Sequence, residues 1–339
     1  MITADLRAAA AALLDGALVV LPTETVYGLA GRADDPAAVA RIYSVKGRPS
    51  GHPVIVHVAD STLDPDAPGA WVREVPDYAR ALAAACWPGP MTLVLPRSAR
   101  ATDDVTGGQD TVAIRVPAHP DALGVLRAMD DIDPGGAPHG VAAPSANLFG
   151  QVSPTTVQHA LEDLRDRLEP NDLAVDGGAC LVGVESTIID CTGEQPRILR
   201  PGGISAADIE RITGLEVLDA ASSGIKVPGA LPSHYAPAAS MALARDADAL
   251  SSYVDAAMIG GTRADAIGII AAATIPTPDG VTRLLQPLSN DEYARGLYEA
   301  LRRADAMGIA FIVAVPPDDD AEGVGAAIAD RLRRASAPR

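Results

Sequence analysis

The chain opens with a helical pattern and continues with a strand pattern. Leu6, Ala9 and Leu13 recur at the spacing of one helix face, and the apolar run 17–21 follows directly after Gly16. Apolar residues three and four positions apart predict an amphipathic helix, and glycine favours a helix end. We therefore predict an N-terminal helix that packs on a sheet whose first strand lies at 17–21.

Both patterns continue, in an irregular order, as far as residue 215. Asp35 before Pro36 is typical of a helix N-terminus and predicts a helix over 37–45. Further helices are predicted at 77–85, 120–128, 154–168 and 206–213, with Ser153 as the N-cap of the helix over 154–168. Strands are predicted at 53–58, 91–95, 111–116, 141–143, 173–175, 186–190 and 197–199. Because strands outnumber the helices between them, we expect an α/β domain on a twisted mixed sheet over 1–215.

The pattern changes after this region. Residues 216–238 are rich in Gly, Pro, Ser and Ala and show little periodicity, which indicates a linker. The segment 239–339 then alternates regularly, with strands predicted at 240–243, 266–270 and 309–313 and helices at 246–258, 290–304 and 323–333. Such alternation is typical of a parallel βαβ sheet, so we predict a smaller, Rossmann-like α/β domain at the C-terminus.

Charge and composition narrow the possible functions. The chain has 27 Lys and Arg against 44 Asp and Glu, a formal net charge of −17, which argues against a protein that binds nucleic acid by neutralising phosphates. Its apolar runs are shorter than the roughly 20 residues of a membrane helix, and no secretory signal is evident. The three cysteines lack the spacing of metal ligands. We expect a cytoplasmic protein that acts on small molecules and has no membrane partner.

One loop combines two cations with glycine and proline. The chain has only two lysines, and one of them, Lys46, lies two residues before Arg48 in the segment 46–53. Paired cations in such a loop suit an anionic ligand. A solvated turn after a helix C-terminus, where cations are also favoured, explains the segment equally well. Both interpretations stay open at this point.

Two strands carry polar residues among aliphatic ones. In 111–116, alternation places Thr111, Ala113 and Arg115 on one face and the aliphatic residues on the other. Arg115 is therefore a candidate clamp for a carboxylate, although an ordinary surface arginine fits the pattern too. His57, within the strand over 53–58, is either a ligand contact or a structural histidine that is half-buried.

Polar turns follow several apolar strands. They occur at 142–147, 177–187 and 200–203, and strand ends of this kind are where open α/β sheets bind ligands. The chain has no GxxxxGK[ST], GxGxxG or GxSxG motif. A phosphate ligand would therefore need a different cradle from the common nucleotide-binding loops.

Taken together, these motifs resemble the YrdC-like threonylcarbamoyl-AMP synthases. The resemblance is carried by Leu21-Pro22-Thr23-Glu24-Thr25-Val26-Tyr27-Gly28-Leu29, Lys46-Gly47-Arg48-Pro49, Ala143-Pro144-Ser145-Ala146-Asn147, Glu185-Ser186-Thr187 and Leu199-Arg200-Pro201-Gly202-Gly203. The segment His234-Tyr235-Ala236-Pro237 and the α/β tail resemble the long, two-domain form of the family. The resemblance implies a YrdC-like catalytic domain over 1–215, a linker over 216–238 that forms a lid on the active site, and a C-terminal domain over 239–339.

The family forms L-threonylcarbamoyl-AMP and pyrophosphate from ATP, L-threonine and bicarbonate. The resemblance therefore implies a nucleotidyltransferase that acts in the threonylcarbamoyladenosine modification of tRNA and supplies a downstream tRNA threonylcarbamoyl transferase complex. Stable tRNA binding by the chain itself is not expected at a net charge of −17. Mg²⁺ is expected as a cofactor carried by the ATP phosphates, because no carboxylate cluster identifies a protein ligand for it.

The resemblance also assigns residues, position by position. It implies that L-threonine is held by Thr25, His57, Arg115 and Ser186, with Arg115 on the carboxylate. It implies that ATP is held by Lys46, Arg48, His52, Thr111, Ala143, Ser145, Asn147, Ser153, Arg200 and Tyr235. Lys46 and Arg48 would also be catalytic, since they would offset charge on the phosphates. The chain departs from the family at His52, where many members have Asn, and in its irregular linker over 222–235.

Two other functions remain as alternatives. A YrdC-like domain without synthase activity would be an RNA-binding module, which the net charge of −17 disfavours. Relatives that mature hydrogenases use carbamoyl phosphate, but they carry zinc-finger modules, and this chain has no CxxC pair.

Overall fold

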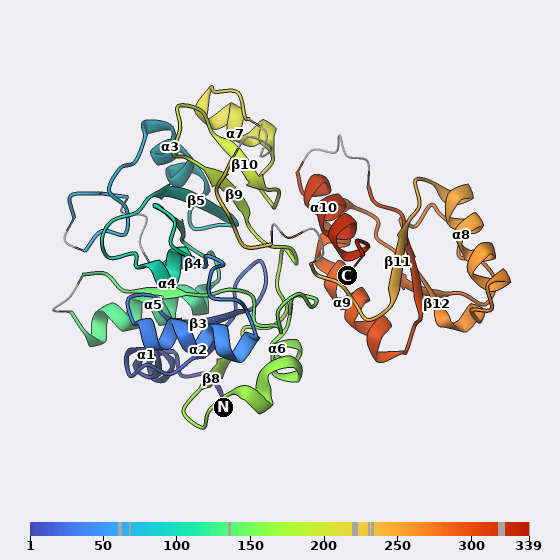
Figure 1. The fold of residues 1–339 in the computed structure, drawn as a ribbon, viewed down its shortest axis with the longest axis horizontal. Helices are drawn as coiled ribbons and strands as arrows, with labels where there is room; N and C mark the ends of the chain where they lie inside the picture. Colours follow the sequence, from blue (N-terminus) through green and yellow to red (C-terminus); the bar gives the residue numbers. More distant parts are fainter. Residues whose placement is uncertain are drawn as a thin grey trace. The chain divides into compact units, whose positions relative to one another are not determined.

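The computed structural model describes residues 1–59, 63–67, 69–134, 137–218, 223–229, 231, 234–317 and 323–338. Its contacts divide the chain into two compact units. The first unit comprises Met1–Phe149, Pro154–Leu181 and Glu185–Ala230, and the second comprises Gly150–Ser153, Val182–Val184 and Leu231–Arg339 (Figure 1). Two short segments from the middle of the sequence thus belong to the C-terminal unit.

The first unit is built on a ten-stranded mixed sheet, counted over the described residues. Its order is β1-β8-β2-β3-β7-β4-β6-β5-β9-β10, in which β4 pairs in parallel with β6 and antiparallel with β7. The strands are β1 (Ile2–Thr3), β2 (Val19–Leu21), β3 (Gly28–Arg32), β4 (Ile55–Val58), β5 (Met91–Pro96), β6 (Thr111–Arg115), β7 (Gly140–Ala142), β8 (Leu173–Val175), β9 (Thr187–Asp190) and β10 (Arg197–Arg200). This confirms the predicted α/β fold on a mixed sheet.

Helices cover both faces of this sheet. On one face, α1 and α5 lie side by side and bury residues such as Leu13 and Leu126 against β2, β3, β7 and β8 (Figure 1). The other face carries the largest core, which includes Ile42 of α2, Leu82 of α3 and Leu161 of α6. The helices of this unit are α1 (Leu6–Leu14), α2 (Pro36–Lys46), α3 (Asp77–Cys86), α4 (Asp103–Thr106), α5 (Pro120–Ile132), α6 (Val157–Leu164), the 3₁₀ helix η1 (Arg165–Arg167) and α7 (Ala206–Thr213).

The two helix N-termini predicted from a capping residue followed by proline have different outcomes. Asp35 caps α2 with Pro36 at its first position, as predicted. The prediction that Ser153 caps a helix beginning at 154 is wrong, because α6 begins at Val157 with Thr156 as its N-cap. The physical reason is that Pro154 belongs to the preceding loop, where its carbonyl accepts the backbone N–H of Tyr27 at 2.9 Å.

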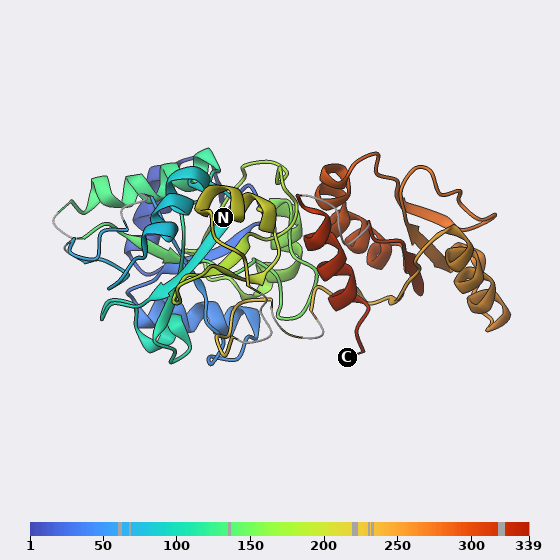
Figure 2. The same cartoon turned by 90° about the horizontal axis from the view of Figure 1, so that it is seen from above.

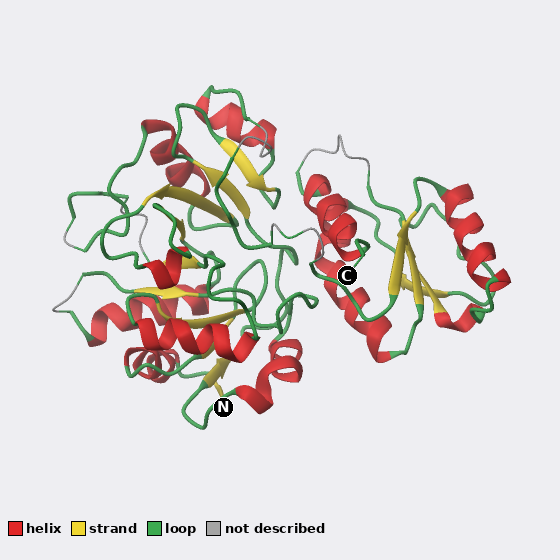
Figure 3. Cartoon of the chain, in the orientation of Figure 1, coloured by secondary structure: helices red, strands yellow, loops and turns green. Residues whose placement is uncertain are grey.

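Within its described residues, the second unit contains a four-stranded parallel sheet of order β11-β14-β12-β13. Its strands are β11 (Ser240–Leu243), β12 (Ile267–Ile270), β13 (Thr282–Leu285) and β14 (Phe311–Ala314), and its helices are α8 (Ala247–Ile259), the 3₁₀ helix η3 (Ala264–Ala266), α9 (Asn290–Ala306) and α10 (Gly325–Ala335). Figures 1 and 2 show α8 on one side of the sheet and α9 and α10 on the other, and Figure 3 separates these helices from the strands by colour. The predicted Rossmann-like alternation is confirmed, with β13 as an addition. Over the described residues, no helix has both the length and the apolar character that a membrane crossing requires.

Candidate active site

The two faces of strands β4 and β6 have different neighbours. Val112 and Ile114 of β6 belong to the largest core, whereas Ala113 packs with Ile55 in a separate cluster on the opposite face. The predicted alternation in 111–116 is therefore confirmed. Since side chains two positions apart share a face, Arg115 and His57 project from the same face as Ala113 and Ile55.

Arg115 and His57 are neighbours across the sheet. They are register partners in the parallel pair β4–β6, and each is only 3% exposed. Burial, together with the positive charge of Arg115, lowers the pKa of His57 to about 3. His57 is therefore neutral at neutral pH, and its Nδ1 has no hydrogen-bond partner among the described residues. A buried ring nitrogen of this kind is suited to a hydrogen bond with a ligand.

The loop between β2 and β3 supplies the partners of Arg115. Arg115 Nη1 donates to Thr25 Oγ1 at 2.9 Å, and Arg115 Nη2 forms a 2.6 Å ion pair with Glu24. Its Nε donates to the carbonyl of Gly89 at 3.2 Å. The structure thus places Thr25 and His57 beside Arg115. No local pattern indicates the role of Glu24, because an ion pair between residues 24 and 115 has no signature in short stretches of sequence.

Ser186, the fourth residue expected at threonine, directly precedes β9 and is fully buried. Its hydroxyl is 2.7 Å from that of Thr92 and accepts a hydrogen bond from Arg200 Nη2 at 3.1 Å. Arg200 also donates to the Ser186 carbonyl through Nε and Nη2, at 3.1 and 2.9 Å. Arg200, which was expected at ATP, therefore fixes Ser186 directly. Thr92 is a further member of this group that sequence reasoning missed.

Lys46 ends helix α2 and is almost fully buried. Its Nζ donates to the carbonyls of Ser145 and Asn147 at 2.5 Å each. Burial, and secondarily the charge of Arg48, lowers the pKa of Lys46 well below its usual value. The structure therefore rules out the solvated turn for this lysine and joins Lys46, Ser145 and Asn147 into one group.

Arg48 and His52 continue from Lys46 along the same loop. Arg48 is 8% exposed, donates to the Pro53 carbonyl at 2.9 Å and lies 5.8 Å from the ring centre of Phe149. The His52 ring lies 5.7 Å from the same Phe149 ring. Partial burial and the charges of Arg48 and Lys226 lower the pKa of His52. Phe149, which the sequence analysis did not select, therefore organises both residues.

The remaining ATP candidates fall in two places. Thr111 begins β6, and the backbone N–H of Ala143 donates to the Ile55 carbonyl at 3.1 Å, so both belong to the sheet of the first unit. Ser153 and Tyr235 belong to the second unit. Their assignment to ATP stays a prediction.

Part of the predicted linker is bound to the first unit. Val227 packs in the cluster that contains Ile55 and Ala113, and Lys226 exchanges two backbone hydrogen bonds with the side chain of Gln109, at 2.7 and 3.0 Å. The Pro228 carbonyl accepts from Arg200 at 3.1 Å. This segment therefore covers the sheet face that carries the candidate site. Residues 219–222, 230, 232 and 233 of the predicted lid lie outside the described residues.

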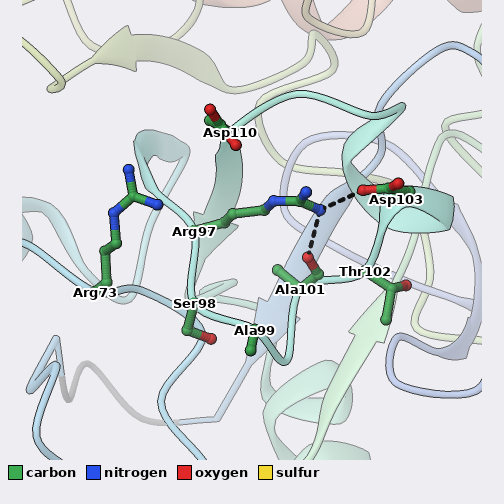
Figure 4. Close-up of a pocket in the computed structure, with 8 residues that line it drawn as sticks. All are labelled: Arg73, Arg97, Ser98, Ala99, Ala101, Thr102, Asp103 and Asp110. Carbon is green, nitrogen blue, oxygen red and sulfur yellow. Dashed lines mark hydrogen bonds and ion pairs between the residues drawn. The ribbon is translucent and has the colours of Figure 1, made fainter.

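A separate surface pocket of about 400 Å³ lies near the end of β5 (Figure 4). Arg97 is already occupied there, since it donates to the Ala101 carbonyl at 3.0 Å and pairs with Asp103 at 2.7 Å. The pocket is lined by Arg73, Arg97, Ser98, Ala99, Ala101, Thr102, Asp103 and Asp110. It contains none of the candidate residues, and its two arginines are balanced by two aspartates, so it does not compete as the active site.

A metal ion held by side chains alone would need a cluster of acidic, histidine or cysteine residues. Within the described residues, no group of three or more His, Cys, Asp or Glu side chains is placed to hold a metal. The side chains of Lys46 and Arg48 are cations, which do not coordinate Mg²⁺, and the Ser145 and Asn147 carbonyls beside them accept hydrogen bonds from Lys46. The residues present therefore do not fit a metal ion held by the protein alone.

Comparisons with known proteins identify the family of the chain. The model of the Sua5, YciO and YrdC family, described as "Telomere recombination", matches residues 11–202, and that of the "Threonylcarbamoyl-AMP synthase, C-terminal domain" matches 204–337. The chain is 37% identical to the threonylcarbamoyl-AMP synthase of Pyrococcus abyssi, covering 98% of this chain and 94% of the relative. It is 39% identical to that of Bacillus subtilis, covering 98% and 92%. The crystal structure of P. abyssi Sua5 complexed with L-threonine superposes with a TM-score of 0.84 at 36% identity, over 98% of this chain and 94% of that one. The chain belongs to the Sua5, YciO and YrdC family, in its long form with the threonylcarbamoyl-AMP synthase C-terminal domain.

Proposed function

We propose that the chain is a threonylcarbamoyl-AMP synthase, which forms L-threonylcarbamoyl-AMP and pyrophosphate from L-threonine, bicarbonate and ATP. The similarity to two such synthases over nearly the whole chain supports this proposal. The observation that carries it is a pair of buried groups in the first unit. One is Arg115 with the neutral His57, and the other is Lys46 with the carbonyls of Ser145 and Asn147. These groups suit a carboxylate and a polyphosphate respectively.

The reaction needs no nucleophile from the protein. The amine of threonine attacks bicarbonate and, with loss of water, becomes an N-carboxylate. An oxygen of this carboxylate attacks the α-phosphorus of ATP, a new P–O bond forms, and the bond to pyrophosphate breaks. Transfer of the adenylyl group makes the enzyme a nucleotidyltransferase. The task of the protein is to place the reactants together and to offset negative charge.

The threonine end of the site is formed by Arg115, His57, Thr25 and Ser186. Arg115 would hold the substrate carboxylate, because a guanidinium offers two parallel N–H groups to two oxygens. The partnerless Nδ1 of His57 is free to bond to the same substrate. A neutral His57 adds no second positive charge beside Arg115.

The ATP end is formed by Lys46, Arg48, Arg200 and the loop 143–147. A protonated lysine has three N–H donors and two serve Ser145 and Asn147, so one remains for a phosphate oxygen. An anionic phosphate beside Lys46 favours its charged form, which opposes the effect of burial. Ser153 and Tyr235 complete the proposed ATP set, together with His52, Thr111 and Ala143.

Mg²⁺ is proposed to enter with ATP, held by its phosphates, where it would neutralise charge on the leaving pyrophosphate. The product is proposed to serve the modification of tRNA through a downstream transferase complex. With a net charge of −17, the chain is expected to release threonylcarbamoyl-AMP without holding tRNA itself.

The test is pyrophosphate release from ATP by the purified chain, with Mg²⁺ and bicarbonate, in the presence or absence of L-threonine. L-serine is the matched control substrate, since it differs by one methyl group. Release that requires both bicarbonate and L-threonine would support the synthase. ATP binding without pyrophosphate release under any of these conditions would contradict it.

A further inference from the structure

The guanidinium of Arg115 is fixed on three sides by the protein. A guanidinium has five N–H donors, and three of them serve Gly89, Thr25 and Glu24 at 3.2, 2.9 and 2.6 Å. Within the described part of the chain, the other two N–H groups have no acceptor. The three contacts therefore decide where those two N–H groups point.

Glu24 is the charged member of this set and has a second contact. Its Oε2 accepts the backbone N–H of Ala118 at 3.0 Å, while its Oε1 accepts from Arg115. The side chains of Glu24 and Arg115 are only 7% and 4% exposed. Since Ala118 lies just beyond the end of β6, Glu24 holds both the arginine and the backbone that follows its strand. It also balances a positive charge that would otherwise be buried alone.

A chain of hydroxyl groups fixes the polarity of Thr25. Thr23 Oγ1 donates its only proton to the Val26 carbonyl at 2.6 Å, so in its 2.8 Å contact with Thr25 it must accept. Thr25 therefore donates to Thr23, and its oxygen accepts from Arg115. Thr25 has no proton left for a ligand and can only accept from one. A ligand here meets two donors on Arg115 and an acceptor on Thr25, which matches the carboxylate and the ammonium or hydroxyl group of an amino acid.

We propose that Glu24 is a positioning residue for L-threonine, one that orients Arg115 and compensates its charge so that the two remaining N–H groups face the substrate carboxylate. This inference rests on the proposed function of the site. On this inference, position 24 needs a carboxylate. Glutamine has one acceptor and one donor at its tip, so its NH₂ would face either Arg115 or the Ala118 N–H, and one of the two contacts would be lost.

The test compares the wild type with Glu24→Gln and Glu24→Asp. Aspartate keeps the charge and both acceptors but is one methylene shorter. Asp34→Asn is the matched control, because Asp34 pairs with Arg100 at 3.0 Å and Arg32 at 3.1 Å in the same unit, away from the site. For each protein, we would measure the Kd for L-threonine by calorimetry, KM for L-threonine and for ATP from pyrophosphate release, and the thermal midpoint.

Glu24→Gln is expected to raise the Kd and KM for L-threonine by about 10-fold or more, with the KM for ATP changed less than about twofold. Glu24→Asp should lie between it and the wild type. Asp34→Asn should alter only the thermal midpoint. A role confined to stability predicts instead that Glu24→Gln behaves like Asp34→Asn.

Three results would overturn the inference. The first is L-threonine binding by Glu24→Gln that is unchanged or tighter than that of the wild type. The second is an equal rise, in Glu24→Gln, of the KM for L-threonine and the KM for ATP. The third applies if Glu24→Gln does not fold, and it is a folded Glu24→Asp protein whose KM for L-threonine equals that of the wild type. If the wild type itself binds no L-threonine, the proposed function fails, and the inference that depends on it fails as well.

Discussion

The Arg331 guanidinium lies 5.2 Å from the centre of the Tyr235 ring, and both side chains are almost completely buried in the second unit. Tyr298 of α9 stacks on the same ring at 5.7 Å. Among the described residues, Tyr235 is the only non-glycine residue with a positive φ, at 60°. Such a conformation costs about 1–3 kcal/mol and persists only when its surroundings hold it in place. Arg331 and Tyr298 are two of the groups that pack against this ring.

Arg331→Met is therefore expected to destabilise the protein by about 2–4 kcal/mol, through loss of the contact with Tyr235 and of the 2.6 Å ion pair with Asp330. The measurement is urea unfolding. The matched control is Arg245→Ala, since Arg245 is 88% exposed and pairs only at the surface. Equal stability of the two variants would contradict the role of Arg331.

Lys46→Met is expected to reduce kcat for pyrophosphate release by about 100-fold or more, because a buried cation at the phosphates is lost. Methionine has nearly the same volume, so the fold should persist. Arg211→Ala, which removes an exposed cation from the same unit, is the control and should leave kcat unchanged. Near-normal turnover by Lys46→Met would remove the lysine from the phosphate site.

Gly202→Ala tests the contact between the segment 200–203 and β9. A Cβ at Gly202 would lie 2.1 Å from the Thr187 nitrogen and 2.6 Å from the Glu185 carbonyl oxygen. The substitution must push the backbone away from Ser186, so stability should fall by about 1–3 kcal/mol and L-threonine binding should weaken. Gly193→Ala is the control, because nothing lies within 4 Å of its Cβ position. The measurements are thermal unfolding and L-threonine titration of both variants. Equal stability and equal L-threonine binding of the two variants would contradict the prediction.

The depressed pKa of His57 predicts a dependence of stability on pH. Between about 6.5 and about 3, the unfolded chain takes up a proton at this histidine and the folded chain does not. Stability therefore falls as the pH drops below 6.5, by up to about 1.4 kcal/mol per pH unit from this residue. The free energy of unfolding of His57→Gln, measured in urea at pH 7, 6 and 5, should fall less steeply than that of the wild type. Parallel pH profiles would show that His57 titrates normally.

Arg115→Lys should weaken the binding of L-threonine more than the binding of ATP. Lysine keeps the charge but offers a single ammonium in place of a planar fork, so it cannot serve Glu24, Thr25 and a carboxylate in the same geometry. Binding of each substrate is measured separately by calorimetry. Equal weakening of both would argue that Arg115 supports the whole fold and does not select threonine.

Local patterns were sufficient to predict most elements of the fold. The alternation in 111–116 and the Asp35–Pro36 signal depend on neighbouring residues, and both are confirmed. Strand β3, Gly28–Arg32, was missed because two of its five residues are glycines, which have a low strand propensity. It is a strand because β2 and β7 pair with it on either side.

In the candidate site, too, some residues can be selected from short-range patterns and others cannot. Lys46 and Arg115 are candidates from the sequence, because the first is one of two lysines and the second lies on the polar face of an alternating strand, and the family resemblance assigns a role to each. Glu24, Thr92 and Phe149 could not be selected, since each acts through a residue that is distant in sequence. Such contacts depend on the register of the sheet, which short-range patterns do not determine.

Two short segments limit how this protein can be divided, because Gly150–Ser153 and Val182–Val184 belong to the second unit. A Cβ at Gly183 would lie 2.4 Å from the Arg295 Cα, so the second of these segments fits closely against α9. A single cut after the first unit would leave both segments without their packing partners. A gene fusion that exchanged the C-terminal part would have to preserve the match to both segments, so we expect the two parts of the chain to be inherited together and to co-vary at these contacts.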